Sequence, residues 1–240
     1  MNRLLFTRSS KHPIILHQYR SITQLSTSTR HRIGIGASKL AQGTTDGVYA
    51  SVLATSLQHS IGTFEAGLGG EEKLRRAYMD ATMYLDDLEK KSSGDSGGDG
   101  GGSGPKEVTL TGRFGYRTTT NPNEYPNDVF VEQSKTEEGA SMSTVQHNIS
   151  KEYVASVLKQ CPLVELYKQQ KHKEGMNIKL VYMAHNPEAQ GRELQEKGAP
   201  LDEVRGLMHE RLIDSFVGLE TAVAEEKIDS YGVCRYVLVK

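Results

Sequence analysis

The chain has 240 residues, of which 36% are hydrophobic and 25% charged, and this is enough for one large domain with a packed core. Its formal net charge is -1 and it has two cysteines, too few for a disulfide framework or a cysteine-based metal site. No apolar run approaches the roughly 18 residues needed to span a bilayer, so the composition excludes a membrane-spanning helix.

The first 31 residues have the composition of an organelle transit peptide. They are rich in Arg, Ser and Thr, and seven basic residues precede Asp46, the first acidic residue. Such a segment suits import across a charged membrane. We expect a mitochondrial address, with a plastid address as second choice; the other interpretation is a basic tail with no address on a cytoplasmic protein. The remainder of the chain is acidic, which argues against nucleic-acid binding.

The residues up to 93 predict strands and helices in alternation. Residues 33–36 form an apolar run with alternate glycines, which suits a strand that another group approaches closely, and residues 59–63 predict a weak second strand. A helix between them has an apolar face made by Val48, Val52, Leu53 and Leu57. A second helix begins near Glu71, and its apolar stripe is Leu74, Tyr78, Ala81, Leu85 and Leu88.

The middle of the chain contains one strand between two stretches without periodicity. Residues 92–105 are dominated by Gly, Ser and Asp and predict a flexible insert. Residues 108–113 predict a strand. The polar stretch 117–147 predicts a long loop, either functional or disordered.

The remaining elements complete a repeating strand–helix pattern. Ser150 is the predicted N-cap of a helix, residues 178–184 predict a buried strand, and residues 228–234 predict a fifth strand. A long amphipathic helix between these strands carries Val204, Met208, Leu212, Phe216, Leu219 and Val223. The alternation predicts an α/β fold with a parallel sheet, and both an open doubly wound sheet and part of an eight-stranded barrel fit it.

Five segments resemble the aldo-keto reductase family and occur in the order found in that family. The most specific match is the run from Val181 to Glu188, VYMAHNPE, which resembles the end of the fourth barrel strand. The other segments are residues 33–36 (IGIG), 61–72 (IGTFEAGLGGEE) and 111–116 (TGRFGY), and a last one in two pieces, residues 216–220 (FVGLE) and 226–233 (EKIDSYGV). The resemblance implies a partial TIM-type (β/α)8 barrel over residues 32–240, with about five of its eight parallel strands.

This family reduces aldehydes and ketones, or oxidises sugars, with NADP as the usual cofactor. Its chemistry uses a tyrosine as proton donor, a lysine paired with an aspartate, and a histidine that orients the carbonyl. The resemblance assigns the histidine to His185 and the lysine position to Arg113. It puts Gly62 at the aspartate position and Gly67, or a gap around it, at the tyrosine position, so the catalytic set is degenerate.

Other residues have two interpretations each. Tyr116, just past the third strand, is a substitute acid or a packing residue. His185 without the resemblance is equally well a structural histidine at a strand end. Gly36 is the candidate for cofactor contact. His59 and His147 have no partner at metal-ligand spacing and are expected at the surface.

The family has three further strand–helix units, and the chain stops before them. Because the late strands hold the nucleotide phosphates in the family, we expect impaired NADP binding. The chain is then a truncated product, an incomplete translation or a pseudoenzyme. The expected function is a weak or inactive carbonyl or sugar oxidoreductase; the alternative is a non-catalytic regulatory protein that pairs with a protein partner through its open sheet edge. The sequence has neither the GxSxG motif of hydrolases nor a Walker loop.

Overall fold

In this computed structural model the described residues are 34–36, 45–93, 107–119, 124–135, 142–171 and 177–234. All of them belong to one compact unit, Ile33–Lys240. The transit-like segment 1–31 and nearly all of the Gly/Ser-rich stretch lie outside the described residues. The organelle address and the flexible insert therefore stay predictions.

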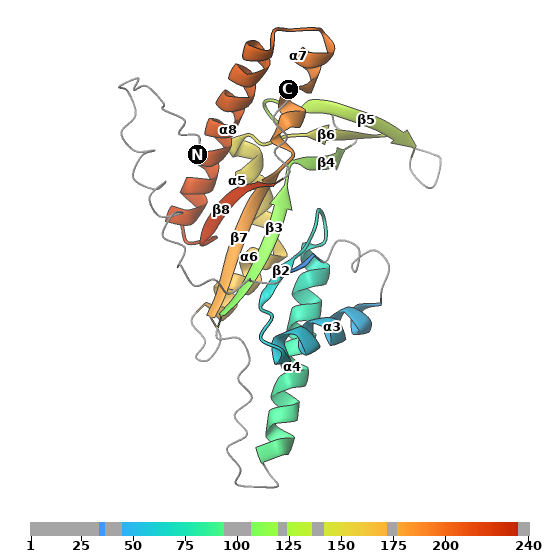
Figure 1. Cartoon of the computed structure of the whole chain (residues 1–240), viewed down its shortest axis with the longest axis vertical. Helices are drawn as coiled ribbons and strands as arrows, with labels where there is room; N and C mark the ends of the chain where they lie inside the picture. The colour runs from blue at the N-terminus through green and yellow to red at the C-terminus, as the bar shows by residue number, and fades with distance from the viewer. Residues whose placement is uncertain are drawn as a thin grey trace, which may run out of the picture. The chain divides into compact units, whose positions relative to one another are not determined.

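The central element is a five-stranded parallel sheet, as the sequence predicts. Its strands lie in the order β1 (Gly34–Gly36), β2 (Thr63–Glu65), β3 (Glu107–Phe114), β7 (Asn177–His185) and β8 (Ser230–Cys234). The order in space is the order along the chain, and Figure 1 shows β2, β3, β7 and β8 side by side. A doubly wound sheet reverses its strand order at a switch point, and these five strands have no reversal.

Helices connect the parallel strands. They are α3 (Asp46–Gln58), α4 (Glu71–Ser93), α5 (Lys151–Gln160), α6 (Pro162–Gln170), α7 (Arg192–Glu196) and α8 (Leu201–Ala224), with a 3-10 turn η1 (Pro187–Gly191) after β7. The helix expected after Ser150 is α5, and Pro162 starts a second helix, α6, at its first position. In Figure 1, α5 and α6 pass behind β3 and β7.

The core lies on one face of the sheet. Alternate residues of β3 and β7 are buried against the helices, and the residues between them are partly or fully exposed. Tyr182 is 1% exposed, and its ring lies so close to Gly112 that a Cβ there would stand 2.3 Å from Tyr182 Cε2. This contact explains why position 112, within the long β3–β7 pair, is a glycine.

The apolar face expected for α3 is partly wrong. Leu53 and Leu57 are buried as predicted, but Val48 is 50% exposed and Tyr49 is fully buried in its place. The helix is therefore rotated so that the large aromatic side chain enters the core. Tyr49 removes more apolar area from water than Val48 could at the same place.

The long loop predicted for residues 117–147 is also wrong. A three-stranded antiparallel sheet occupies this stretch, with β4 (Tyr116–Thr119) and β5 (Val129–Lys135) on either side of β6 (Met142–His147). Arg117 joins its parts, since Nη2 lies 2.5 Å from Asp128 Oδ2 and 2.9 Å from Gln146 Oε1. Burial alone would raise the pKa of Asp128, but hydrogen bonds from Arg117 and Asn148 hold the pKa below its usual value.

Ser150 caps α5 as predicted. Its side-chain oxygen accepts from the backbone N–H of Tyr153 at 3.3 Å, and the residue is 2% exposed. We expect Ser150→Ala to lower the free energy of unfolding by about 1 kcal/mol, the usual value of a lost N-cap. Urea denaturation measures this. Ser150→Asp, which restores an acceptor, is expected to recover most of the loss, and a Ser150→Ala variant as stable as the parent would contradict the capping role.

Candidate functional site

The candidate site lies where β3, β7 and β8 end. His185 is the last residue of β7 and pairs in register with Cys234, the last residue of β8. The chain leaves β3 at Phe114 and turns directly into β4, which begins at Tyr116. The carboxyl ends of parallel strands form the edge where α/β proteins place their ligands. The side chains of His185, Cys234 and Tyr116 lie at that edge.

His185 is buried, with 5% of its surface exposed. Its ring Nδ1 lies 3.1 Å from Cys234 Sγ, which is within hydrogen-bond distance for a thiol and an imidazole. The backbone N–H of Asn186 donates to the carbonyl of Cys234 at 3.1 Å and locks the ends of the two strands together. The sequence predicted the position of His185 correctly, but it gave no signal for the cysteine partner.

Tyr116 packs against His185. The two ring centroids are 5.8 Å apart, with the planes at 66°. Asn186 Nδ2 donates to the Tyr116 hydroxyl oxygen at 3.2 Å, which leaves the hydroxyl proton available to donate elsewhere. The structure thus brings together two of the predicted site residues, His185 and Tyr116.

His147 lies against both His185 and Tyr116. It is fully buried, so the surface position predicted for it is wrong, whereas His59 is exposed as expected. Its Nε2–H donates to the carbonyl of His185 at 2.8 Å, and its Nδ1 accepts from Gln190 Nε2 at 2.8 Å. Burial lowers the pKa of His147 to about 4, which keeps the ring neutral near pH 7.

Gly115 allows this close approach. Its φ is +138°, a value that side chains rarely adopt. A Cβ at this position would stand 2.7 Å from the carbonyl oxygen of His185 and 2.8 Å from His147 Nε2. The glycine therefore lets the β3–β4 turn pass directly over the end of β7.

Arg113 forms an ion pair with Glu65 on the partly exposed face of the sheet. Their side chains are 19% and 27% exposed, so the pair is largely shielded from water. Arg113 is in register with Met183, two residues before His185 on the same face of β7. The sequence did not predict a carboxylate partner for Arg113, because Glu65 lies three residues after Gly62, which occupies the aspartate position of the family.

Two features bear on a nucleotide cofactor. Asn186 Oδ1 is a buried acceptor with no hydrogen-bond partner among the described residues, which fits the amide N–H of a nicotinamide. In the part of the chain that the structure describes, no heavy atom stands within 4 Å of a Cβ built on Gly36, which leaves room beside β1 there, although Gly36 lies two strands away from β3. Arg113 and Arg117 already pair with carboxylates. The described residues thus fit the amide end of the cofactor better than its diphosphate.

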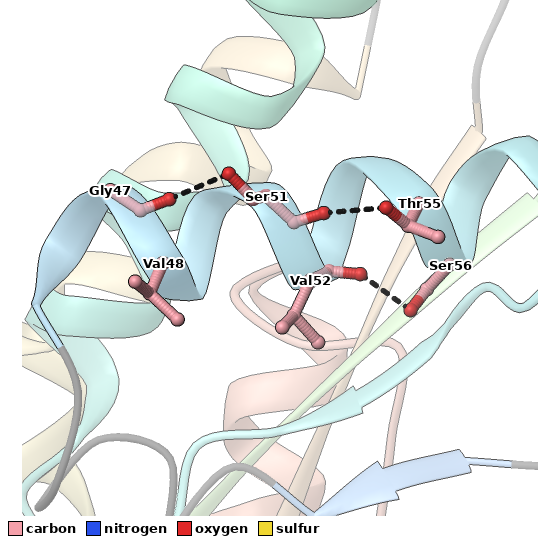
Figure 2. Close-up of a pocket in the computed structure, with 6 residues that line it drawn as sticks. All are labelled: Gly47, Val48, Ser51, Val52, Thr55 and Ser56. Atoms are coloured by element: carbon pink, nitrogen blue, oxygen red, sulfur yellow. Dashed lines mark hydrogen bonds between the residues drawn. The ribbon is translucent and has the colours of Figure 1, made fainter.

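A shallow depression of about 420 Å³ lies on α3 and contains no reactive group. Figure 2 shows that the hydroxyls of Ser51, Thr55 and Ser56 donate to carbonyls one turn earlier in the same helix. The side chains left to line it are Val48 and Val52, shown as sticks in Figure 2. This depression adds nothing to the cluster around His185.

Comparisons with protein-family models, with curated proteins and with solved structures found no match to this chain. Among the described residues no three His, Cys, Asp or Glu side chains stand together in a way that would hold a metal ion. The helices in this part of the chain include none with the length and apolarity needed to cross a membrane.

Proposed function

We propose that the chain is an aldo-keto reductase-like protein with weak NADPH-dependent activity on aldehydes or ketones. The observation that carries the proposal is the contact between Tyr116 and His185 at the carboxyl end of the sheet. A phenol and an imidazole side by side can supply the two hydrogen bonds that a carbonyl oxygen needs during reduction. The sequence motif around His185 supports the same activity.

The fold that we propose is part of a TIM-type (β/α)8 barrel. Strand order that follows chain order supports it, because right-handed crossovers then put every connecting helix on one face of the sheet. The other face, with Glu65, Thr111, Arg113 and Met183 partly exposed, would be the barrel interior. An open sheet with this strand order is the competing architecture.

The roles assigned to the chain are donation of a proton to the carbonyl oxygen of the substrate and orientation of that carbonyl group. Tyr116 donates its hydroxyl proton to the carbonyl oxygen as negative charge develops there. His185 hydrogen-bonds the same oxygen and fixes the carbonyl plane. The Arg113–Glu65 pair supplies a cation and a carboxylate on the neighbouring strands, as the lysine and aspartate of the family do. Arginine keeps its proton at all ordinary pH values, so it acts only as a fixed charge, which is one reason to expect a slow reaction.

The nucleotide would be held at its amide end. Asn186 Oδ1 would accept from the carboxamide, and the space above Gly36 would admit part of the cofactor. The bound nucleotide supplies the hydride. Since Arg113 and Arg117 are engaged by carboxylates, we expect weak binding.

A fluorescence titration with NADPH tests the cofactor assignment. We expect saturable binding with a Kd of about 0.1–1 mM, at the weak end of ordinary enzyme affinities. Asn186→Ala is expected to weaken binding about tenfold, because the acceptor for the amide is lost. Gln169→Ala removes an exposed amide from α6 and is the matched control. Absence of saturation up to about 1 mM, or equal affinities for the two variants, would contradict the assignment.

A second candidate function is non-catalytic pairing with a protein partner. Within the described residues, β1 and β8 each have a hydrogen-bonded neighbour on one side only, and such edges can pair with another chain. Sedimentation equilibrium, together with an assay of NADPH turnover, distinguishes the pairing function from the reductase function. A stable complex of the protein that lacks NADPH turnover would favour pairing, and a folded monomer would count against it.

We propose that residues 1–31 direct the protein to mitochondria. This proposal rests on the composition of the segment alone. A fluorescent reporter fused behind residues 1–31 is expected to enter mitochondria. A variant with Arg3, Arg8, Arg20 and Arg30 changed to Gln is expected to lose the targeting. Delivery to plastids, or none at all, would contradict the mitochondrial address.

A further inference from the structure

We propose that Cys234 and His185 form a thiol–imidazole pair that captures α,β-unsaturated carbonyl compounds covalently at Cys234. The capture needs neither a bound nucleotide nor hydride transfer. It depends on the 3.1 Å contact between Cys234 Sγ and His185 Nδ1, on the partial exposure of Cys234 and on the position of Tyr116.

The pair provides both a nucleophile and its base. A thiolate attacks carbon, and a neutral thiol is a poor nucleophile. His185 Nδ1 is within hydrogen-bond distance of Sγ, so it can take the thiol proton as the bond forms. His185 is buried while Cys234 is partly exposed, so an electrophile reaches the sulfur while the base is shielded from bulk water.

The neighbouring side chains select the class of electrophile. In the addition step, Sγ forms a bond to the β-carbon and the π electrons of the double bond move through an enolate to the carbonyl oxygen. Tyr116 lies against His185 and can donate its hydroxyl proton in a hydrogen bond to that oxygen. The proton held by His185 then returns to the α-carbon, so the adduct forms without any oxidant or reductant.

The chain contains its own control, Cys161. This cysteine is the only other one in the sequence, it is 7% exposed, and the Tyr182 hydroxyl donates to its sulfur at 3.2 Å. Burial raises the pKa of the Cys161 thiol. The two thiols therefore differ in the two properties that govern reactivity, exposure and a neighbouring base.

The first experiment uses N-ethylmaleimide, itself an α,β-unsaturated carbonyl compound, on the folded full-length protein. Mass spectrometry of the two cysteine peptides follows the rates. We expect Cys234 to react at least about tenfold faster than Cys161 at pH 7. In guanidinium chloride the two rates are expected to become equal. Equal rates in the folded protein would overturn the proposal.

The dependence of the rate on pH tests the pairing in the unaltered protein. An ordinary thiol loses about a hundredfold in rate between pH 8 and pH 6, because its pKa is about 8.5. We expect the rate at Cys234 to fall less than about tenfold over the same range, since His185 takes the thiol proton as the bond forms and the attack does not require prior loss of that proton to water. A hundredfold decline would overturn the pairing. In His185→Gln, provided that its circular dichroism matches the parent, the steep profile should return while Cys161 stays unchanged.

Matched aldehydes test the ligand class. We expect but-2-enal to leave a stable adduct on Cys234 after dialysis. Butanal, which lacks the double bond, is expected to leave none. Adducts at both cysteines alike, or no adduct from but-2-enal at Cys234, would overturn the selectivity. A failure here leaves the reductase proposal intact, because that proposal is tested by NADPH binding and turnover.

Discussion

Acidification from pH 7 to pH 4 is expected to lower the free energy of unfolding by about 3 kcal/mol through His147 alone. The folded-state pKa of His147 is about 4, against an ordinary value of 6.5. As the pH falls, the unfolded chain takes up the proton first. The stabilisation is therefore complete above pH 6.5 and is lost progressively until about pH 4.

The physical cause is the fixed surroundings of the ring. His147 is fully buried, its Nε2–H donates to the carbonyl of His185, and its Nδ1 already accepts from Gln190. A second ring proton would have to displace the Gln190 amide without gaining solvation. Protonation is therefore expected to separate β6 from the ends of β7 and η1.

Urea denaturation at several pH values measures this effect. His147→Gln removes the titration and is expected to flatten the pH dependence between pH 6.5 and pH 4, whatever its stability at pH 7. His209→Gln changes an exposed histidine of α8 and should leave the slope unchanged. A parent protein equally stable at pH 4.5 and pH 7 would show that burial does not keep the His147 ring neutral.

Gly115→Ala is expected to lower the free energy of unfolding by about 3 kcal/mol or more, because it combines backbone strain with overpacking. The φ of +138° is unfavourable for alanine. The added Cβ would also stand 2.7 Å from the carbonyl oxygen of His185, a backbone atom that cannot turn away. The β3–β4 turn would have to lift off β7, which would separate Tyr116 from His185.

Gly206→Ala is the matched control. Gly206 lies inside α8, and no heavy atom of the described residues stands within 4 Å of a Cβ built on it. Replacing a helical glycine by alanine there is expected to stabilise the protein by about 1 kcal/mol. If Gly115→Ala changed stability by less than about 0.5 kcal/mol, the close passage over β7 would be wrong.

The sequence predicts the parallel sheet well because its signals are local. The run from 178 to 184 is apolar except for Lys179, and the alternation of strands and helices indicates parallel strands joined by crossover helices. His185 follows directly from that strand. The antiparallel sheet was missed because polar residues such as Thr118 and Gln146 lie among its strands, so no apolar period distinguishes the strands from a loop.

The site itself was harder to predict, because its contacts join distant parts of the chain. Cys234 and His185 are 49 positions apart, and Gln190 and His147 are 43 positions apart. Neither pair has a characteristic spacing in the sequence. Tyr116 was recognised as a candidate, but its contact with His185 depends on the turn at Gly115. A glycine after a strand indicates only that some backbone conformation is special, not which group it approaches.

The rate of NADPH oxidation with a simple aldehyde such as butanal is the most direct test of the carbonyl site. We expect slow, saturable turnover by the parent protein. Tyr116→Phe is expected to lower it about a hundredfold, since the proton donor is lost, and His185→Ala should also reduce it. Tyr84→Phe, which changes an exposed tyrosine of α4, should have no effect. Turnover that is unchanged in both Tyr116→Phe and His185→Ala, or absent from the parent protein, would contradict a carbonyl-reducing site at the ends of β3 and β7.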